Sequence, residues 1–376
     1  MINAEIIHSD EELTQYYWYD AAYTNDMNID LFLTDYIDAR ESNSSFLEGQ
    51  CVLFDRAKRD RDPYVGDFPV AGRTLYLTHP AVAAAAAAKN VLLDLAQHQR
   101  DDGWTPPASI RSYTKYILFH SLTIRSAGAY LDSTVGPVRH AQDGNSIAIL
   151  SGATPLNQSQ SALAYLDANM RQSYGNAFYD AQGNVLNPAA GFSTRVYAFI
   201  SYFEISARFE TNLTDQAIDQ IKRMYGWMAT HDPLVTMWEG IGAEGTLYEG
   251  GFTSCAHGWS TGVLPALTNY VLGVKPTQTG FSKLSVRPSV PEGMSWARGV
   301  VPTPLGDVGV DWKIDGGTFT LIVTAPKGSE ATISVPVGED GKVTVGAQAV
   351  WGRGESKGLG AHFRDGYVTV DTTQLR

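Results

Sequence analysis

The spacing of apolar residues changes near Gly273, and this change constrains the fold more than any other feature. From Ser9 to about Leu272, apolar side chains recur mainly every three or four positions, as on one face of an α-helix. After Gly273, short runs rich in Val, Thr and Ile alternate with polar residues and are separated by Gly, Pro and Asp. The sequence therefore predicts a helical domain over residues 1–273 and an antiparallel β-sandwich over residues 274–376.

Several of the predicted helices have recognisable ends. Ser9 followed by early acids indicates one start, and Pro80 indicates another for a helix that runs to about Gln99. Further helices are expected over Asn157–Tyr174, Thr194–Glu210, Asp215–Thr230 and Ser260–Leu272. Repeated helix pairs joined by long loops indicate an α/α toroid. Alternating helices and strands would instead indicate a parallel sheet.

In the second domain, strands are expected where the period-two alternation is clear. They are predicted over Lys283–Arg287, Asp307–Ile314, Thr318–Ala325, Ala331–Val337 and Tyr367–Asp371. Lys275-Pro276-Thr277 is interpreted as a short linker between the two domains.

Charge and composition exclude several classes of partner. A formal net charge of −12 and the lack of a basic stripe argue against nucleic acid. The chain has no run of eighteen apolar residues, so no membrane partner is expected. Met1 is not followed by a signal-peptide pattern, so the chain as written is expected to be cytoplasmic, or secreted if its N-terminus is truncated. The oligomeric state is left open.

Cysteine and histidine patterns argue against a metal site. The two cysteines, Cys51 and Cys255, do not form a disulfide scaffold, and whether they pair is left open. His-x-x-x-His and Cys-x-x-Cys are absent, so no metal is predicted. A Ser–His–Asp hydrolase is not predicted either. No cofactor is expected.

Two segments far apart in the sequence carry groups suited to acid–base chemistry. The segment Asp55–Asp67 holds four carboxylates and four cations, and such crowding raises the pKa of a carboxyl group. Composition alone favours a solvated salt-bridge loop there. The second segment is Trp238-Glu239-Gly240, with Glu244 and Glu249 as nearby competitors, and it is followed by His257 in a Gly-flanked turn. Glycoside hydrolysis needs two such carboxylates: one protonates the leaving oxygen, and the other activates water or attacks the anomeric carbon.

The run Asp55-x-Ala57-Lys58-Arg59-Asp60-Arg61, followed by Gly66-Asp67, resembles the acidic signature of glycoside hydrolase family 78, the α-L-rhamnosidases, in particular their fungal branch. The similarity continues in collinear order through Leu13–Thr24, Gln142–Ser146, Trp238–Gly240, Ala256–Gly262 and Tyr270–Pro276. The resemblance implies an (α/α)6 barrel of the six-hairpin glycosidase type. It also implies hydrolysis of terminal α-L-rhamnosides with inversion, on a rhamnose-containing oligosaccharide or glycoside.

The same resemblance implies roles for individual residues. Asp60 takes the position of the general acid and Glu239 that of the general base. The residues expected to contact the sugar or to form the wall of its pocket are Asp55, Arg59, Asp67, Trp238, His257 and Trp259.

The chain also departs from the family pattern. It begins where the helical barrel begins, the stretch Trp104–Asp132 is compressed, and Pro63-Tyr64 replaces the signature's Trp. These departures indicate a truncated or mis-assembled gene product with an incomplete barrel, or a degenerate paralogue. Two alternatives to the rhamnosidase stay open: a catalytically impaired or vestigial carbohydrate-binding paralogue, and a six-hairpin glycosidase that acts on another sugar. The aglycone and the linkage are not predicted.

Overall fold

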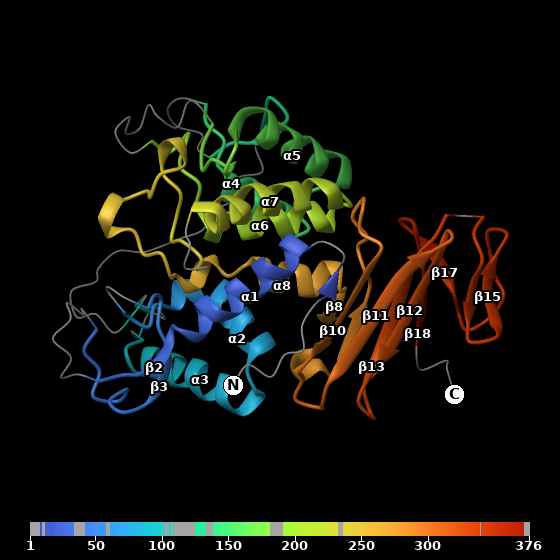
Figure 1. Ribbon diagram of the computed structural model, residues 1–376, viewed down its shortest axis with the longest axis horizontal. Coiled ribbons are helices and arrows are strands. Elements are labelled where there is room, and N and C mark those ends of the chain that lie inside the picture. The colour runs from blue at the N-terminus through green and yellow to red at the C-terminus, as the bar shows by residue number, and fades with distance from the viewer. Residues whose placement is uncertain are drawn as a thin grey trace. The chain divides into compact units, whose positions relative to one another are not determined.

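The computed structural model describes most of the chain (Figure 1). The described residues are 8–9, 12–33, 42–57, 61–99, 101, 105–106, 108, 125–132, 138–180, 191–231, 236–338 and 340–371. Contacts within the chain group it into two compact units. The helical unit comprises Tyr16–Tyr76 and Val82–Pro265; the strand unit comprises Met1–Gln15, Leu77–Ala81 and Ala266–Arg376. The domain boundary after Gly273 stays a prediction.

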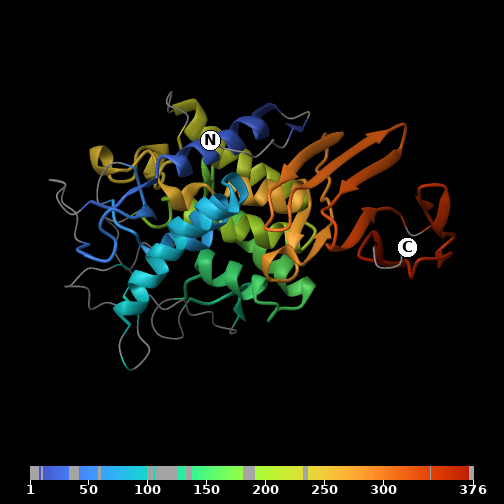
Figure 2. The same cartoon turned by 90° about the horizontal axis from the view of Figure 1, so that it is seen from below.

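The first part of the chain is mainly helical, as predicted. Its α-helices are α1 (Glu12–Asp26), α2 (Arg73–Thr78), α3 (Ala81–Gln97), α4 (Gln142–Leu150), α5 (Leu156–Met170), α6 (Ala198–Glu210), α7 (Thr214–His231) and α8 (Val263–Ala266). The alanine run gives α3 its helix propensity, and α3 is the long cyan helix of Figure 2. In α7 the buried residues recur at helical spacing, for example Ile218, Ile221 and Met228. None of the described helices is long and apolar enough to cross a membrane.

Three predicted helices differ from their expected bounds. The one predicted over Ser260–Leu272 is observed as α8 (Val263–Ala266) followed by a π-helix over Leu267–Val271. The helix predicted to reach Tyr174 ends at Met170, because the chain turns into the hairpin of β6 (Arg171–Gln172) and β7 (Gly175–Asn176). Gly175 has φ +128° there, in a region that favours glycine. The helix predicted from Thr194 begins at Ala198, since the Thr194 N–H closes a turn on the Gly191 carbonyl.

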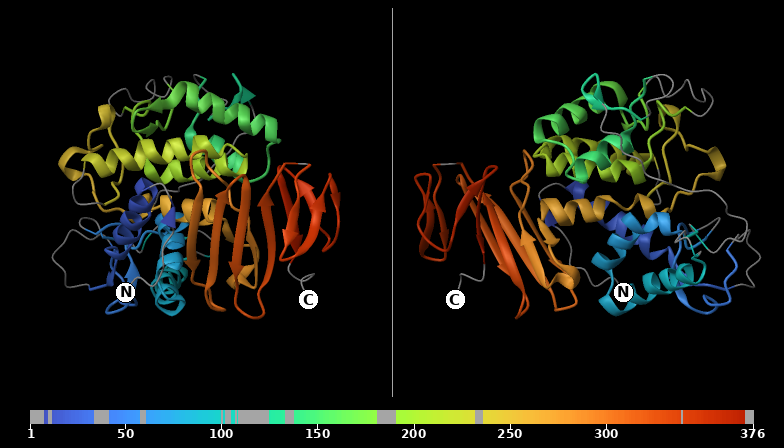
Figure 3. Two further views of the ribbon diagram at one scale, coloured as in Figure 1. Left: turned by 45° about the vertical axis from the view of Figure 1, so that its right-hand side comes forward. Right: turned by 180° about the vertical axis from the view of Figure 1, so that it is seen from behind.

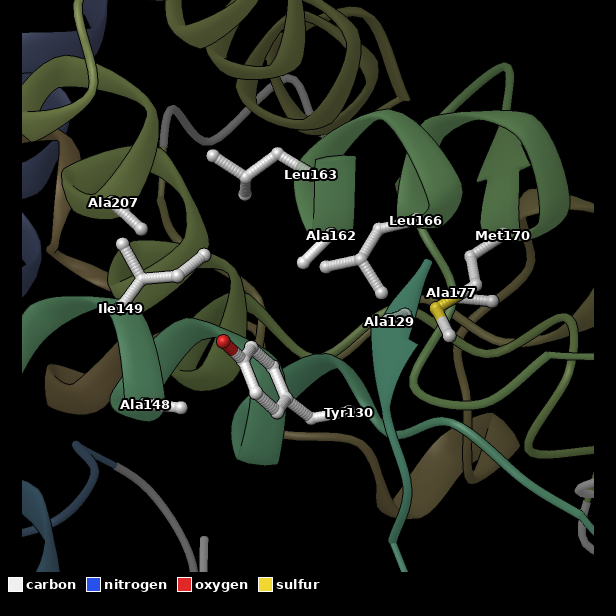
Figure 4. Close-up of a cluster of buried hydrophobic side chains, with 10 residues drawn as sticks. All are labelled: Ala129, Tyr130, Ala148, Ile149, Ala162, Leu163, Leu166, Met170, Ala177 and Ala207. Carbon is white, nitrogen blue, oxygen red and sulfur yellow. The ribbon is translucent and has the colours of Figure 1, made fainter. Parts of the chain in front are cut away.

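Apolar and charged groups together hold α4 to α7. Figure 4 shows a cluster in which Leu163, Leu166 and Met170 of α5 gather with Ile149 of α4. All these side chains are buried. Within α6, the side chains of Glu204 and Arg208 form a fully buried ion pair at 2.5 Å. Gln142 of α4 and Gln220 of α7 donate to the other Glu204 oxygen at 2.6 and 2.9 Å, so the buried charge is satisfied from three helices.

The strand unit contains most of the strands. They are β1 (His8–Ser9), β8 (Val274–Pro276), β9 (Lys283–Val286), β10 (Trp296–Val301), β11 (Val308–Asp315), β12 (Thr318–Thr324), β13 (Glu330–Pro336), β14 (Val343–Val345), β15 (Gln348–Gly352), β16 (Glu355–Ser356), β17 (His362–Arg364) and β18 (Tyr367–Asp371). The sheet orders are β1-β10-β11-β12, β17-β18-β13-β9-β8 and β14-β15-β16. Figure 3 shows the long arrows of β10 to β12.

Three expectations for this unit were wrong in detail. β9 pairs with β13 in parallel, so the sheets are not wholly antiparallel. Lys275 and Pro276 are not a linker, because they form β8 and pair with Ser285 and Leu284 of β9. Ser9 does not start a helix, because its backbone pairs with Ala297 of β10, and α1 begins at Glu12.

Candidate active site

The first part of the site follows a short hairpin of the helical unit. β2 (Ile29–Leu31) pairs with β3 (Cys51–Leu53), and the adjacent Phe54 is buried in an apolar cluster with Phe32. Asp55 comes next and is 1% exposed. Its N–H donates to the Asp62 carbonyl, and its Oδ1 accepts from the Asp62 N–H, each at 3.0 Å. One backbone bond and one side-chain bond between Asp55 and Asp62 therefore join the two ends of this loop.

Two of the predicted residues belong to this loop but cannot be placed. Arg59 and Asp60 lie outside the described residues, so the positions of the expected sugar-binding arginine and general acid stay predictions.

Backbone hydrogen bonds join this loop to two later segments of the helical unit. The Gly258 N–H donates to the Asp55 carbonyl at 2.8 Å, and Arg56 forms a β-bridge with His257. The Glu239 N–H donates to the Ser254 carbonyl at 2.8 Å. At Gly258 an added Cβ would lie 2.9 Å from the Asn28 side chain and 3.1 Å from the Ala71 Cβ, so this approach requires glycine.

The Glu239 side chain is buried among hydrogen-bond donors. Tyr248 donates its hydroxyl to Oε1 at 2.9 Å, and the Ser254 N–H donates to Oε2 at 3.0 Å. Arg56 Nη1 lies 3.2 Å from Oε1. Hydrogen-bond donors therefore hold both oxygens of this carboxyl group. The competing candidates Glu244 and Glu249 are exposed.

Asp67 and His257 form a buried pair beside Glu239. His257 Nε2 lies 3.1 Å from Asp67 Oδ1, and His257 Nδ1 lies 4.0 Å from Glu239 Oε1. Burial raises the pKa of Asp67 to about 7; Glu239 adds to this rise, while Arg56 opposes it. Asp67 is thus a carboxyl group that exchanges its proton near neutral pH.

The Asp55 carboxyl group also resists ionisation. Burial and the nearby Asp67 raise its pKa well above the usual range, although Arg56 acts in the opposite direction. Arg56 Nε contacts Asp55 Oδ2 at 2.7 Å. Among the described residues, the buried carboxyl groups of Asp55, Asp67 and Glu239 thus lie around the Arg56 guanidinium. A change of one charge there therefore alters the pKa of Asp55 and of Asp67.

Aromatic rings border this polar group. The His257 ring stacks on Trp259 at 4.2 Å, and Trp259 stacks on Phe199 at 5.5 Å. Trp259 is partly exposed, and its Nε1 donates to the Glu239 carbonyl at 3.0 Å. Trp238 is 5% exposed, and its carbonyl accepts from Ser260 Oγ at 2.7 Å. Trp259 therefore presents a ring surface beside the site, whereas Trp238 is mostly enclosed by protein.

The structure places four of the predicted residues close together, with other residues that were not predicted. Asp55, Asp67, Glu239 and His257 do converge. Arg56 and Tyr248 were not predicted. Arg56 was visible as one of the cations in the Asp55–Asp67 segment. Tyr248 carries no motif that could have identified it.

Within the described residues, no group of three or more His, Cys, Asp or Glu is arranged to hold a metal ion. Cys51 and Cys255 are not joined in a disulfide bond.

Comparisons with known proteins point to one enzyme class. Residues 273–349 match the family described as the bacterial alpha-L-rhamnosidase C-terminal domain. A stretch of 56 residues is 39% identical to an alpha-L-rhamnosidase of Alteromonas sp. (strain LOR), covering 15% of this chain and 6% of that protein.

Among solved structures, the alpha-L-rhamnosidase from Dictyoglumus thermophilum matches with a TM-score of 0.61 at 13% identity, covering 98% of this chain and 49% of that one. The Streptomyces avermitilis alpha-L-rhamnosidase complexed with L-rhamnose gives a TM-score of 0.49 at 14% identity, covering 98% of this chain and 41% of that one. The chain thus spans about half the length of the solved rhamnosidase that it matches. It shares the fold of the corresponding part of that structure, and its residues 273–349 match the rhamnosidase C-terminal domain.

Proposed function

We propose that this chain is a glycoside hydrolase of the α-L-rhamnosidase type, related to the fungal branch of family 78, and that it hydrolyses terminal α-L-rhamnosides. The observation that carries the proposal is the convergence of Asp55, Asp67, Glu239 and His257 beside the Trp259 ring. The proposed architecture is an (α/α)6 six-hairpin barrel over residues 1–273 followed by a β-sandwich over residues 274–376. The helical fold and the match over residues 273–349 support it.

In the proposed mechanism, Glu239 is the general base. It removes a proton from a water molecule as that water attacks the anomeric carbon, and the donors Arg56, Tyr248 and Ser254 orient it. Asp60 is proposed to protonate the leaving oxygen. Inversion needs room for the water, so the two carboxyl groups should stand about 6.5–9.5 Å apart.

Sugar recognition is assigned to the other polar groups of the site. Asp55, Arg59, Asp67 and His257 are proposed to bind ring hydroxyls, because carboxylates accept from two adjacent hydroxyls and imidazole can donate or accept. The Trp259 ring, partly exposed and stacked on His257, offers a flat apolar surface for the C–H face of the sugar.

A release assay with nitrophenyl glycosides tests this proposal. We expect turnover of the α-L-rhamnoside and not of the β-D-glucoside or the β-D-glucuronide. Glu239→Gln should abolish turnover, whereas Glu244→Gln, which changes an exposed glutamate of the following turn, should retain it.

Other outcomes would replace the proposal. Turnover of a different glycoside would identify a six-hairpin glycosidase that acts on another sugar. Rhamnose binding in a calorimeter without any turnover would identify a vestigial binding protein.

A further inference from the structure

Arg56 contacts both carboxyl-bearing loops of the site. Its Nε lies 2.7 Å from Asp55 Oδ2, and its Nη1 lies 3.2 and 3.4 Å from the two oxygens of Glu239. Its side chain is 11% exposed. A guanidinium is planar and permanently charged, so donating one edge to Asp55 fixes the direction in which the other nitrogen points.

This side chain is not needed to join the loops. The Gly258 N–H already bonds the Asp55 carbonyl at 2.8 Å, and the Ala57 N–H bonds the Ala256 carbonyl at 3.2 Å. These backbone bonds form whatever the side chain at position 56 is. The contacts of the Arg56 guanidinium therefore concern the carboxyl groups of the site and not the joining of the loops.

We infer that Arg56 is a positioning residue: anchored on Asp55, its guanidinium holds the Glu239 carboxyl group in one orientation. The catalytic part of this inference rests on the proposed function of Glu239 as a general base. The geometric part does not, because it concerns the direction in which the Glu239 side chain points whatever reaction occurs.

Other groups also face the Glu239 carboxyl group. Tyr248 donates a hydrogen bond to Oε1, and His257 Nδ1 lies 4.0 Å from the same oxygen. Asp55 lies on the far side of the guanidinium. Because Arg56 Nη1 reaches both oxygens of Glu239, the loss of Arg56 removes a contact that limits rotation of the carboxyl group.

A direct test compares crystal structures of the full chain as the wild type and as Arg56→Met. In Arg56→Met the Glu239 carboxyl group should turn away from its present direction or occupy more than one orientation, and in Arg56→Lys it should move less. Arg223→Met is the matched control. The Arg223 side chain is 12% exposed and pairs with Asp219 at 2.9 Å elsewhere in the helical unit, so its loss should leave Glu239 in place. An unchanged orientation of Glu239 in Arg56→Met overturns the inference.

Steady-state kinetics on the α-L-rhamnoside separate positioning from a merely structural role. In Arg56→Met kcat should fall while KM changes little, because the proposed base is held less well although the groups that bind the sugar remain. In Arg56→Lys kcat should fall less, because lysine keeps a cation between the two carboxyl groups, and this variant decides the matter if Arg56→Met does not fold. An unchanged kcat, or a rise in KM as large as the fall in kcat, overturns the inference. If the wild type turns over no rhamnoside but Glu239 still moves in Arg56→Met, the proposed function fails and the positioning role of Arg56 is supported.

Discussion

Replacing Asp67 by asparagine should stabilise the protein at neutral pH while impairing the proposed activity. Asp67 is buried, and burial raises its pKa to about 7. In the unfolded chain an aspartate has a pKa of about 3.9. The folded state therefore binds the Asp67 proton more tightly than the unfolded state does, and ionising this group disfavours folding.

The magnitude follows from the two pKa values. The pKa of Asp67 differs by about three pH units between the folded and the unfolded chain, which corresponds to about 4 kcal/mol in the free energy of unfolding. The destabilisation is absent below about pH 4, grows as the pH rises to about 7, and is constant above that. Asparagine keeps an oxygen that can accept from His257 Nε2, which now lies 3.1 Å from Asp67 Oδ1, so the exchange removes the charge without removing the hydrogen bond.

Urea unfolding of the wild type and of Asp67→Asn at several pH values between about 4 and 8 checks this expectation. Asp219→Asn is a control of opposite sign. Burial raises the pKa of Asp219, but hydrogen bonds from Arg171 and Arg223 outweigh burial and lower it overall. That variant should be less stable than the wild type at neutral pH and should approach it as the pH falls. A stability difference for Asp67→Asn that does not depend on pH, or a loss of stability at neutral pH, would refute the reasoning.

Three further changes test other contacts. Trp259→Ala removes the ring stacked on His257, so KM for the rhamnoside should rise more than kcat falls in steady-state assays. Leu166→Ala leaves a cavity at a fully buried position and should lower the free energy of unfolding by about 2–5 kcal/mol, measured by urea titration. Glu204→Gln breaks the buried pair with Arg208 and should lower it by about 3–5 kcal/mol, with loss of unfolding cooperativity as a second readout.

The elements that could be predicted have a strong local period. In α7 the buried residues recur every three or four positions, and β11 and β12 alternate clearly. β10 was missed because the positions it buries include Ala297 and Gly299, whose small side chains hide the alternation. The strand at Ser9 was missed because its pairing partner lies almost 300 residues away and overrides a local capping signal. Long-range pairing also decides the parallel contact of β9 with β13.

The site was predictable where the chemistry marks the residue. Asp55, Asp67, Glu239 and His257 stand in distinctive motifs, and the structure brings them together. The contact of Arg56 with Glu239 depends on the loop geometry, which includes the bonds between Asp55 and Asp62. The composition of the segment does not reveal this geometry. The chain turns between Glu239 and Tyr248, where Gly245 has φ +79°, and the Tyr248 hydroxyl contacts Glu239. No spacing of residues in the sequence predicts this contact.

The stereochemistry of the first-formed sugar tests the central claim most directly. Proton NMR of an aryl α-L-rhamnoside during the first moments of hydrolysis distinguishes the two anomers before mutarotation mixes them. If Glu239 activates water for attack on the face opposite the leaving group, β-L-rhamnose appears first, and Glu239→Gln gives no product. If α-L-rhamnose appears first, or if Glu239→Gln turns over at the wild-type rate, Glu239 is not the general base of an inverting hydrolysis.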